Sequence, residues 1–312
     1  LKNIEFAIQG TLMTHYTTLI SAEQLQDLTK SGQPLRIFDC SFALMQPHEG
    51  LQNYLNSHIP GAIYADLETA LSARHGVPGA HGVMTASGAD APASGGRHPL
   101  PNREKFATWL SSVGMGNDMQ AVVYDRNQVN YCGRLWWMLK WAGHENVAVL
   151  DGGLQAWQAA GGAVSSGEEP AHFQTNFLTS PERAQLVDVQ TVVSQLGRPA
   201  QTLIDARATP RFKGEVEPLD PVAGHIPGAL NRPFGLNMMP DGKFKPAEQL
   251  KAEFTALLGQ RDPSTVVHHC GSGVSALPNL IAMEVAGLGR TALYAGSWSD
   301  WCKDPDRPVA KS

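Results

Sequence analysis

The chain has 312 residues, of which 42% are hydrophobic and 17% are charged, and its formal net charge is −5. This composition is typical of a globular protein long enough for two domains, and the negative charge argues against nucleic acid or an anionic membrane as the main partner. No apolar run approaches the roughly 20 residues of a membrane-spanning helix, and the chain does not begin like a secretory signal peptide.

The first twelve residues precede a methionine, Met13. We expect the natural chain to start there, and residues 1–12 to be a leader left over from expression.

The first half of the chain alternates between predicted helices and predicted strands. Polar–apolar periodicity predicts helices over 21–30 and 102–114, and short apolar runs predict strands over 35–39, 121–124 and 147–150. A loop and helix follow the second strand, and a helix containing Trp157 follows the third. Strands separated by helices predict an α/β fold with an open, twisted, mostly parallel sheet and helices on both faces.

The second half repeats the first. HIPGA occurs at 58–62 and again at 225–229, and the same order of helices and strands follows it, with predicted strands over 202–205, 265–268 and 290–294. We therefore predict two similar domains, 13–165 and 184–312, joined by a linker over 166–183.

The spacing between the repeats locates an insertion. His58 and His225 are 225 − 58 = 167 residues apart, whereas Val123 and Val267 are 267 − 123 = 144 apart, so the first copy has 23 more residues between these landmarks. The excess falls in 70–101, a Gly-, Ala- and Pro-rich excursion without periodicity. Whether residues 70–97 form a lid stays open.

The stretch VVHHCGSGVSALPNL, 266–280, carries the strongest chemical signal. Thiolate, and not thiol, is the reactive form of cysteine. A curled loop of backbone N–H groups follows Cys270 at the start of a predicted helix, and such a loop favours the thiolate anion. Gly271 and Gly273 let the loop curl, and Ser272 and Ser275 add hydroxyl groups. The alternative is a buried thiol at a tight turn. The 144-residue spacing places Arg126 opposite Cys270, so only the second copy is predicted to carry a nucleophile.

Four cysteines are present, at positions 40, 132, 270 and 302. They form no CxxC pair and no zinc-like Cys/His spacing, so we expect reduced thiols, no metal and a cytoplasmic location.

Several motifs together resemble the tandem-domain sulfurtransferases of the rhodanese family. They are HIPGA in both copies, DGGLQAW at 151–157, CGSGVSA at 270–276 and YAGSW at 294–298. The resemblance implies two tandem rhodanese-like domains, the first without a nucleophile and the second catalytic. The cysteine loop is similar to that of 3-mercaptopyruvate sulfurtransferases, because thiosulfate-preferring members carry basic residues there and 271–276 has none. The segment ALPN, 276–279, departs from the family pattern.

This resemblance implies a two-step reaction without a metal or organic cofactor. Cys270 takes sulfur from 3-mercaptopyruvate as a persulfide and passes it to cyanide or to a thiol such as thioredoxin or a low-molecular-weight thiol. Gly271, Gly273, Val274 and Ser275 are expected to contact the donor. Thiosulfate as the donor, or a sulfur-relay or binding module with little turnover, are the alternatives.

The resemblance also implies roles for residues outside the loop. Arg207 is expected to anchor the donor carboxylate, with help from Arg211 and from Lys213, which stands where the family usually has a second arginine. A surface ion pair is the alternative for Arg207.

A proton-relay set is the second implied group. Asp66 is expected to orient His98, which in turn serves Ser272 or the leaving enolate. The alternative is an ordinary loop histidine, with Arg97 as an anion contact.

A cysteine phosphatase is the nearest chemical rival. Such enzymes need an arginine at the end of the loop to bind phosphoryl oxygens, and Ala276 occupies that place.

Overall fold

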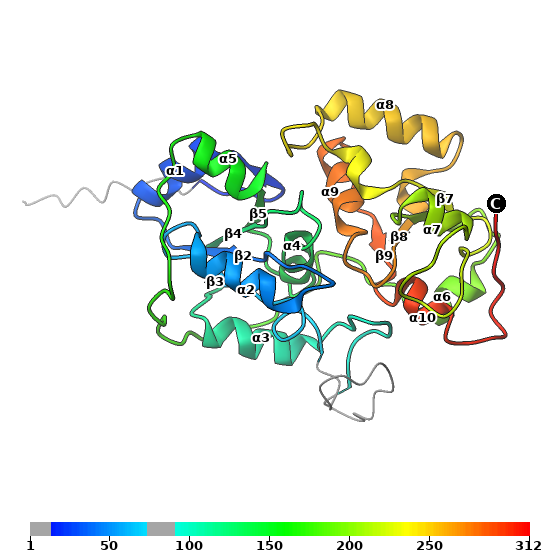
Figure 1. Ribbon diagram of the computed structural model, residues 1–312, viewed down its shortest axis with the longest axis horizontal. Helices are drawn as coiled ribbons and strands as arrows, with labels where there is room; N and C mark the ends of the chain where they lie inside the picture. Colours follow the sequence, from blue (N-terminus) through cyan, green and yellow to red (C-terminus); the bar gives the residue numbers. More distant parts are fainter. Residues whose placement is uncertain (1–13, 74–90) are drawn as a thin grey trace, which may run out of the picture.

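The computed structural model describes residues 14–73 and 91–312 (Figure 1). The expected leader at 1–12 and most of the 70–97 segment considered as a lid lie outside the described residues. The chain forms two α/β units that follow one another along the sequence, and the prediction of two tandem parallel-sheet domains is confirmed.

The first unit is built on a five-stranded parallel sheet with the strand order β1-β5-β4-β2-β3. Its strands are short and mostly buried on both faces, as expected when helices cover a parallel sheet. They are β1 (Leu19–Ile20), β2 (Leu35–Asp39), β3 (Ile63–Tyr64), β4 (Gln120–Tyr124) and β5 (Val147–Leu150).

Helices cover both faces of this sheet. Val122 packs in one apolar cluster with the first and last helices, and its neighbour Val123 packs in the other cluster with the third and fourth. This alternation follows from the two-residue period of a strand. The helices are α1 (Ala22–Lys30), α2 (Pro47–Asn56), α3 (Arg103–Ser112), α4 (Cys132–Trp141) and α5 (Gly153–Ala159).

The second unit repeats the plan with the strand order β7-β6-β8-β9, again all parallel. The strands are β6 (Thr202–Asp205), β7 (Leu230–Asn231), β8 (Val266–His269) and β9 (Ala292–Leu293). The helices are α6 (Val189–Ser194), α7 (Thr209–Lys213), α8 (Ala247–Leu258), α9 (Leu277–Val285) and α10 (Ser297–Trp301), with short 3₁₀ helices η2 (Phe234–Asn237) and η3 (Pro263–Thr265). The predicted linker 166–183 contains no helix or strand.

A shared apolar core joins the two units. Helices α4 and α9 lie side by side at the junction (Figure 1), and Leu135 and Leu277 belong to the same buried cluster. Gly133 permits this approach, because a Cβ there would lie 2.8 Å from the Cβ of Leu277. The carboxyl ends of β6 and β8 therefore face the first unit, and a site at that edge is built from both.

The strand registers correct the sequence alignment of the two copies. Asp39 pairs with Tyr124 and Asp205 pairs with His269, so Asp125, and not Arg126, corresponds to Cys270. The backbone agrees, because the carbonyl of Asp125 accepts the N–H of Leu154 as that of Cys270 accepts the N–H of Trp298. The prediction that Arg126 lies opposite Cys270 was wrong by one residue. Paired positions are 148 − 122 = 26 residues apart across β4 and β5 but 292 − 267 = 25 apart across β8 and β9, so a single offset between the copies cannot align both pairs of strands.

Candidate active site

Cys270 follows β8 directly, at the carboxyl edge of the second sheet, and is 2% exposed. Its N–H donates to the Ser297 hydroxyl at 3.1 Å, and its carbonyl accepts the N–H of Trp298 at 3.0 Å. The carbonyl of Gly271 accepts the N–H of Ser299 at 2.8 Å. The first turn of α10 therefore fixes the backbone that carries the sulfur.

The loop after Cys270 curls as the sequence predicted. Gly273 has φ +74, and a Cβ there would lie 2.2 Å from the carbonyl oxygen of Ala295, so glycine is required on both counts. Within the described residues, the backbone N–H groups of 271–276 donate to no protein oxygen. They precede the N-terminus of α9, where helix and loop dipoles favour negative charge.

The equivalent loop of the first unit binds a carboxylate. Asp125 occupies the cysteine's position, and its carboxylate accepts four backbone N–H groups of its own loop, from Asn127, Val129, Tyr131 and Cys132, at 2.8–3.0 Å. An internal anion thus fills the first loop. The corresponding second loop is available to an anionic sulfur on Cys270.

A buried cation from the first unit lies behind the cysteine loop. Arg134, on α4, is 0% exposed and donates to the carbonyls of Gly273 at 3.0 Å, His98 at 2.8 Å and Leu71 at 3.3 Å. Its hydrogen bonds among the described residues all go to backbone carbonyls and none to a carboxylate. Burial lowers the pKa of Arg134 to about 9, and the nearby Cys270 acts in the opposite direction. Its positive charge favours an anion in the loop.

The structure brings the predicted His98 and Ser272 together but changes the third partner. The two side chains are both buried, with 2.7 Å between His98 Nδ1 and Ser272 Oγ, and Nε2 of His98 lies 3.3 Å from a carboxylate oxygen of Glu68. Burial lowers the pKa of His98, and Glu68 partly opposes this. A neutral ring of this kind can relay a proton through Ser272.

The predicted role of Asp66 in orienting His98 is wrong. Its carboxylate accepts the backbone N–H groups of Glu68 at 3.0 Å and Thr69 at 2.9 Å and lies 3.3 Å from the hydroxyl of Tyr64. Asp66 therefore stabilises the turn that presents Glu68, which is a common use of an aspartate at a turn.

Arg207 is buried in an ion-pair network. It binds both carboxylate oxygens of Asp205 at 2.7–3.1 Å and the carbonyl of Gly224 at 2.7 Å, and it stacks 4.7 Å from the ring of Trp298. Because the buried carboxylate of Asp205 binds the fork of the guanidinium group, the role of Arg207 as the anchor of the donor carboxylate stays a prediction.

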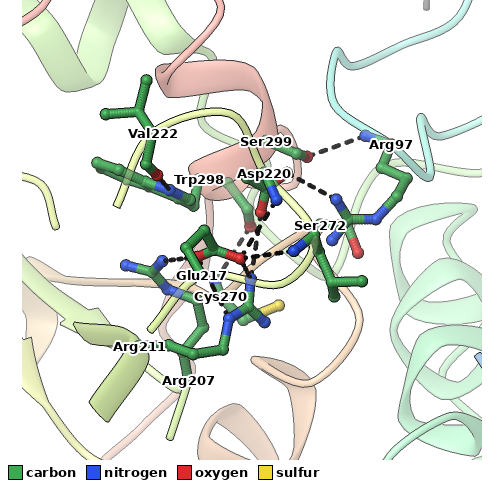
Figure 2. Close-up of polar contacts among 12 residues, drawn as sticks. Arg97, Arg207, Arg211, Glu217, Asp220, Val222, Cys270, Ser272, Trp298 and Ser299 are labelled. Atoms are coloured by element: carbon green, nitrogen blue, oxygen red, sulfur yellow. Dashed lines mark hydrogen bonds and ion pairs between the residues drawn. The ribbon is translucent and has the colours of Figure 1, made fainter. Parts of the chain in front are cut away.

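Arg211 and Arg97 flank the cysteine loop (Figure 2). A Cβ on Gly271 would lie 3.3 Å from Arg97 Nη2 and 3.6 Å from Arg211 Nη1. Lys213 is exposed at the end of α7, so the structure does not support its predicted contact with the donor. Val274 packs in the shared core, and Ser275 is partly exposed.

The other three cysteines are less suited to react. Burial raises the pKa of Cys40 and Cys132 well above the ordinary thiol value, and burial together with Asp220 raises that of Cys302 to about 11. All four cysteines are free.

Sequence reasoning missed four groups of this site: Ser297, Arg134, Glu68 and the carboxylates Glu217 and Asp220 that bind the arginines. Only Ser297 had a usable signal. It replaces Gly153 of the first copy and keeps a positive φ of 55, which a serine adopts here while its hydroxyl accepts the N–H of Cys270.

The sequence predicted neither a metal site nor a membrane-spanning helix. In the ranges 14–73 and 91–312, no group of three or more His, Cys, Asp or Glu side chains is arranged to hold a metal ion. None of the helices described has the length and apolar character needed to cross a membrane.

Comparison with known proteins connects this geometry to a family. The family model for the rhodanese-like domain matches two segments, 21–160 and 188–304. The chain is 46% identical over 297 residues to a probable 3-mercaptopyruvate sulfurtransferase from Pseudomonas aeruginosa, covering 94% of this chain and 97% of that one. It is 36% identical to a putative thiosulfate sulfurtransferase from Mycobacterium tuberculosis, covering 94% and 96%.

A solved structure has a similar fold. The 3-mercaptopyruvate sulfurtransferase from Leishmania major superposes with a TM-score of 0.75 at 30% identity, covering 94% of this chain and 75% of that one.

Proposed function

Because the chain belongs to the rhodanese family and is a sulfurtransferase, we propose that its donor is 3-mercaptopyruvate and that Cys270 carries the sulfur as a persulfide. The observation that carries this proposal is the loop after Cys270, whose N–H groups 271–276 donate to no protein oxygen among the described residues and whose counterpart in the first unit holds a carboxylate.

In the first half-reaction the Cys270 thiolate attacks the sulfur of the donor. A bond forms between the two sulfurs, the carbon–sulfur bond of the donor breaks, and its electron pair leaves as the enolate of pyruvate. The enolate then takes a proton, and the Ser272 hydroxyl, 2.7 Å from the buried His98 ring, is placed to relay it.

In the second half-reaction an acceptor removes the outer sulfur. A thiolate, from thioredoxin or a low-molecular-weight thiol, or cyanide attacks this sulfur, the sulfur–sulfur bond breaks, and the electron pair returns to Cys270 as thiolate. The same loop N–H groups and the charge of Arg134 stabilise the anion that is released. This cycle needs no cofactor.

The choice of 3-mercaptopyruvate over thiosulfate rests on charge. Residues 271–276 include no cation, and the flanking Arg97 and Arg211 are already paired with carboxylates. A dianion such as thiosulfate needs more uncompensated positive charge than a monocarboxylate does. We place the donor carboxylate near Arg97 and Arg211.

Cytoplasmic location is also a proposal, supported by four free cysteines, which are typical of proteins in reducing compartments.

Steady-state kinetics test this function. We expect a higher kcat/KM for 3-mercaptopyruvate than for thiosulfate, with cyanide as the common acceptor, and no turnover of either donor by Cys270→Ser. A preference for thiosulfate would overturn the donor assignment. Absence of turnover with both donors and all three acceptors would instead favour a binding module.

A further inference from the structure

A compensated cluster of charges lies beside the nucleophile (Figure 2). Asp220 binds Arg97 Nη1 at 2.6 Å with one carboxylate oxygen and Arg211 Nη2 at 3.2 Å with the other. Its side chain is only 3% exposed. Since Arg97 belongs to the first unit and Arg211 to the second, this single carboxylate bridges the two units.

The bridge lies where an anionic donor has to approach. Both guanidinium groups are packed against Gly271, the residue after Cys270. The sulfur-bearing residue itself is almost completely buried. A donor that reaches the sulfur from this side therefore meets the ion pairs of Asp220 first.

The charges of the cluster cancel. Three guanidinium groups face three carboxylates, with Glu217 bound to Arg211 at 2.6 Å and Asp205 bound to Arg207 at 2.7 Å. The Nε of Arg97 is buried and has no hydrogen-bond partner among the described residues, so this guanidinium group keeps a free donor. An anion gains little electrostatic stabilisation from the cluster while Asp220 remains in place. It can bind both arginines only when its own charged group replaces that carboxylate.

We propose that Asp220 determines the charge specificity of the site: its carboxylate occupies the position between Arg97 and Arg211 that the anionic group of a donor takes, and it repels donors in proportion to their charge. This inference rests on the proposed function, which supplies an anionic donor. The repulsion acts twice as strongly, in free energy, on a dianion as on a monoanion. Asp220 therefore disfavours the approach of thiosulfate more strongly than that of 3-mercaptopyruvate.

Asp220→Asn tests the proposal without removing the pocket, because an amide oxygen can still accept from Arg97 and Glu217 still binds Arg211. Glu215→Gln is the matched control, since it removes an exposed carboxylate from the same loop. We expect Asp220→Asn to raise kcat/KM for 3-mercaptopyruvate roughly 10-fold and for thiosulfate roughly 100-fold at low ionic strength. Glu215→Gln changes both by less than about 2-fold.

A second measurement does not depend on sulfur transfer. The rates at which iodoacetate and iodoacetamide alkylate Cys270 compare an anion with a neutral reagent of similar size. We expect the iodoacetate/iodoacetamide ratio to rise about 10-fold in Asp220→Asn and to fall in Arg97→Gln, which removes one of the two cations.

The two measurements separate the two claims. An unchanged alkylation ratio in both variants, or an equal rise in Glu215→Gln, would overturn the role of Asp220 even if the enzyme turns over. If no sulfur donor is turned over but the ratio shifts as expected, the charge-specificity role stands and the proposed donor chemistry fails.

Discussion

Cys270 and Asp125 occupy the same place in the two units, and this equivalence explains what the cysteine loop does. In the first unit four N–H groups converge on the carboxylate of Asp125. In the second unit Cys270 takes the place of Asp125, and the buried cation Arg134 donates to the carbonyl of Gly273 in the equivalent loop. The equivalent loop therefore serves folding in the first unit, and we propose that it serves chemistry in the second.

The relay on Ser272 gives the first prediction. His98→Gln should lower kcat for 3-mercaptopyruvate about 100-fold, the usual size of a general acid–base contribution. Glu68→Gln should cost only a few-fold, because this carboxylate is 49% exposed and 3.3 Å from the ring. Since Glu68 raises the pKa of His98, its removal should move any limb of the kcat–pH profile that reports His98 to lower pH.

Asp66→Asn is the matched control for Glu68→Gln. It should leave that limb in place, because Asp66 contacts the turn at 66–69 and not the ring. A pH limb that moves in Asp66→Asn and stays in Glu68→Gln would restore the original prediction.

At the scale of elements, periodicity and turn residues were sufficient to predict the strands, the helices and the Gly-rich loop. These patterns could not predict contacts between residues that are distant in the sequence. Asn279, in the unexplained ALPN segment, accepts from the side chain of Asn237 at 2.6 Å and donates to the carbonyl of Arg232 at 2.9 Å. These bonds tie α9 to η2, and Pro278 lies in the first turn of α9, where it costs no hydrogen bond. No local pattern encodes such a contact.

The loop after Cys270 gives a prediction at this scale. Gly273→Ala should destabilise the fold by more than about 2 kcal/mol, because a left-handed φ costs a non-glycine residue about 1–2 kcal/mol and the carbonyl of Ala295 has to move as well. We also expect kcat/KM to fall at least about 10-fold, since the N–H groups around the sulfur shift. Urea unfolding and steady-state kinetics measure the two effects.

Gly242→Ala isolates the backbone component of this cost. Gly242 has φ +81 and nothing within 4 Å of a built Cβ, so its replacement should cost only the φ strain and leave kcat/KM unchanged. Equal destabilisation by the two substitutions, with full activity in both, would contradict a steric requirement at Gly273.

At the scale of the molecule, the first unit contributes side chains to the surroundings of Cys270. It contributes Arg134 behind the cysteine loop, His98 on Ser272 and Arg97 beside Gly271. Internal repetition predicted the two domains and placed the nucleophile in the second. It did not predict these contacts, because the packing of α4 on α9 depends on surfaces far apart in the sequence. The ion-pair partners of Arg207 could not be predicted for the same reason.

Arg134 supplies the prediction for the interface. Arg134→Met should slow alkylation of Cys270 by iodoacetamide at pH 7 about 10-fold, because the loop loses the buried positive charge. It should also destabilise the protein by a few kcal/mol, since three buried carbonyls lose their donor. Arg134→Lys keeps the charge but reaches fewer carbonyls, so it should restore the alkylation rate more fully than the stability. Equal alkylation rates in Arg134→Met and the unaltered protein would contradict the electrostatic role.

The mass of the protein after exposure to donor tests the central claim most directly. After incubation with 3-mercaptopyruvate and removal of the excess, we predict a gain of about 32 Da, one sulfur atom, which peptide mapping places on Cys270. A thiol acceptor should remove it, and Cys270→Ser should never acquire it. An unchanged mass with every sulfur donor, or a transferable sulfur on Cys302 in place of Cys270, would contradict the account.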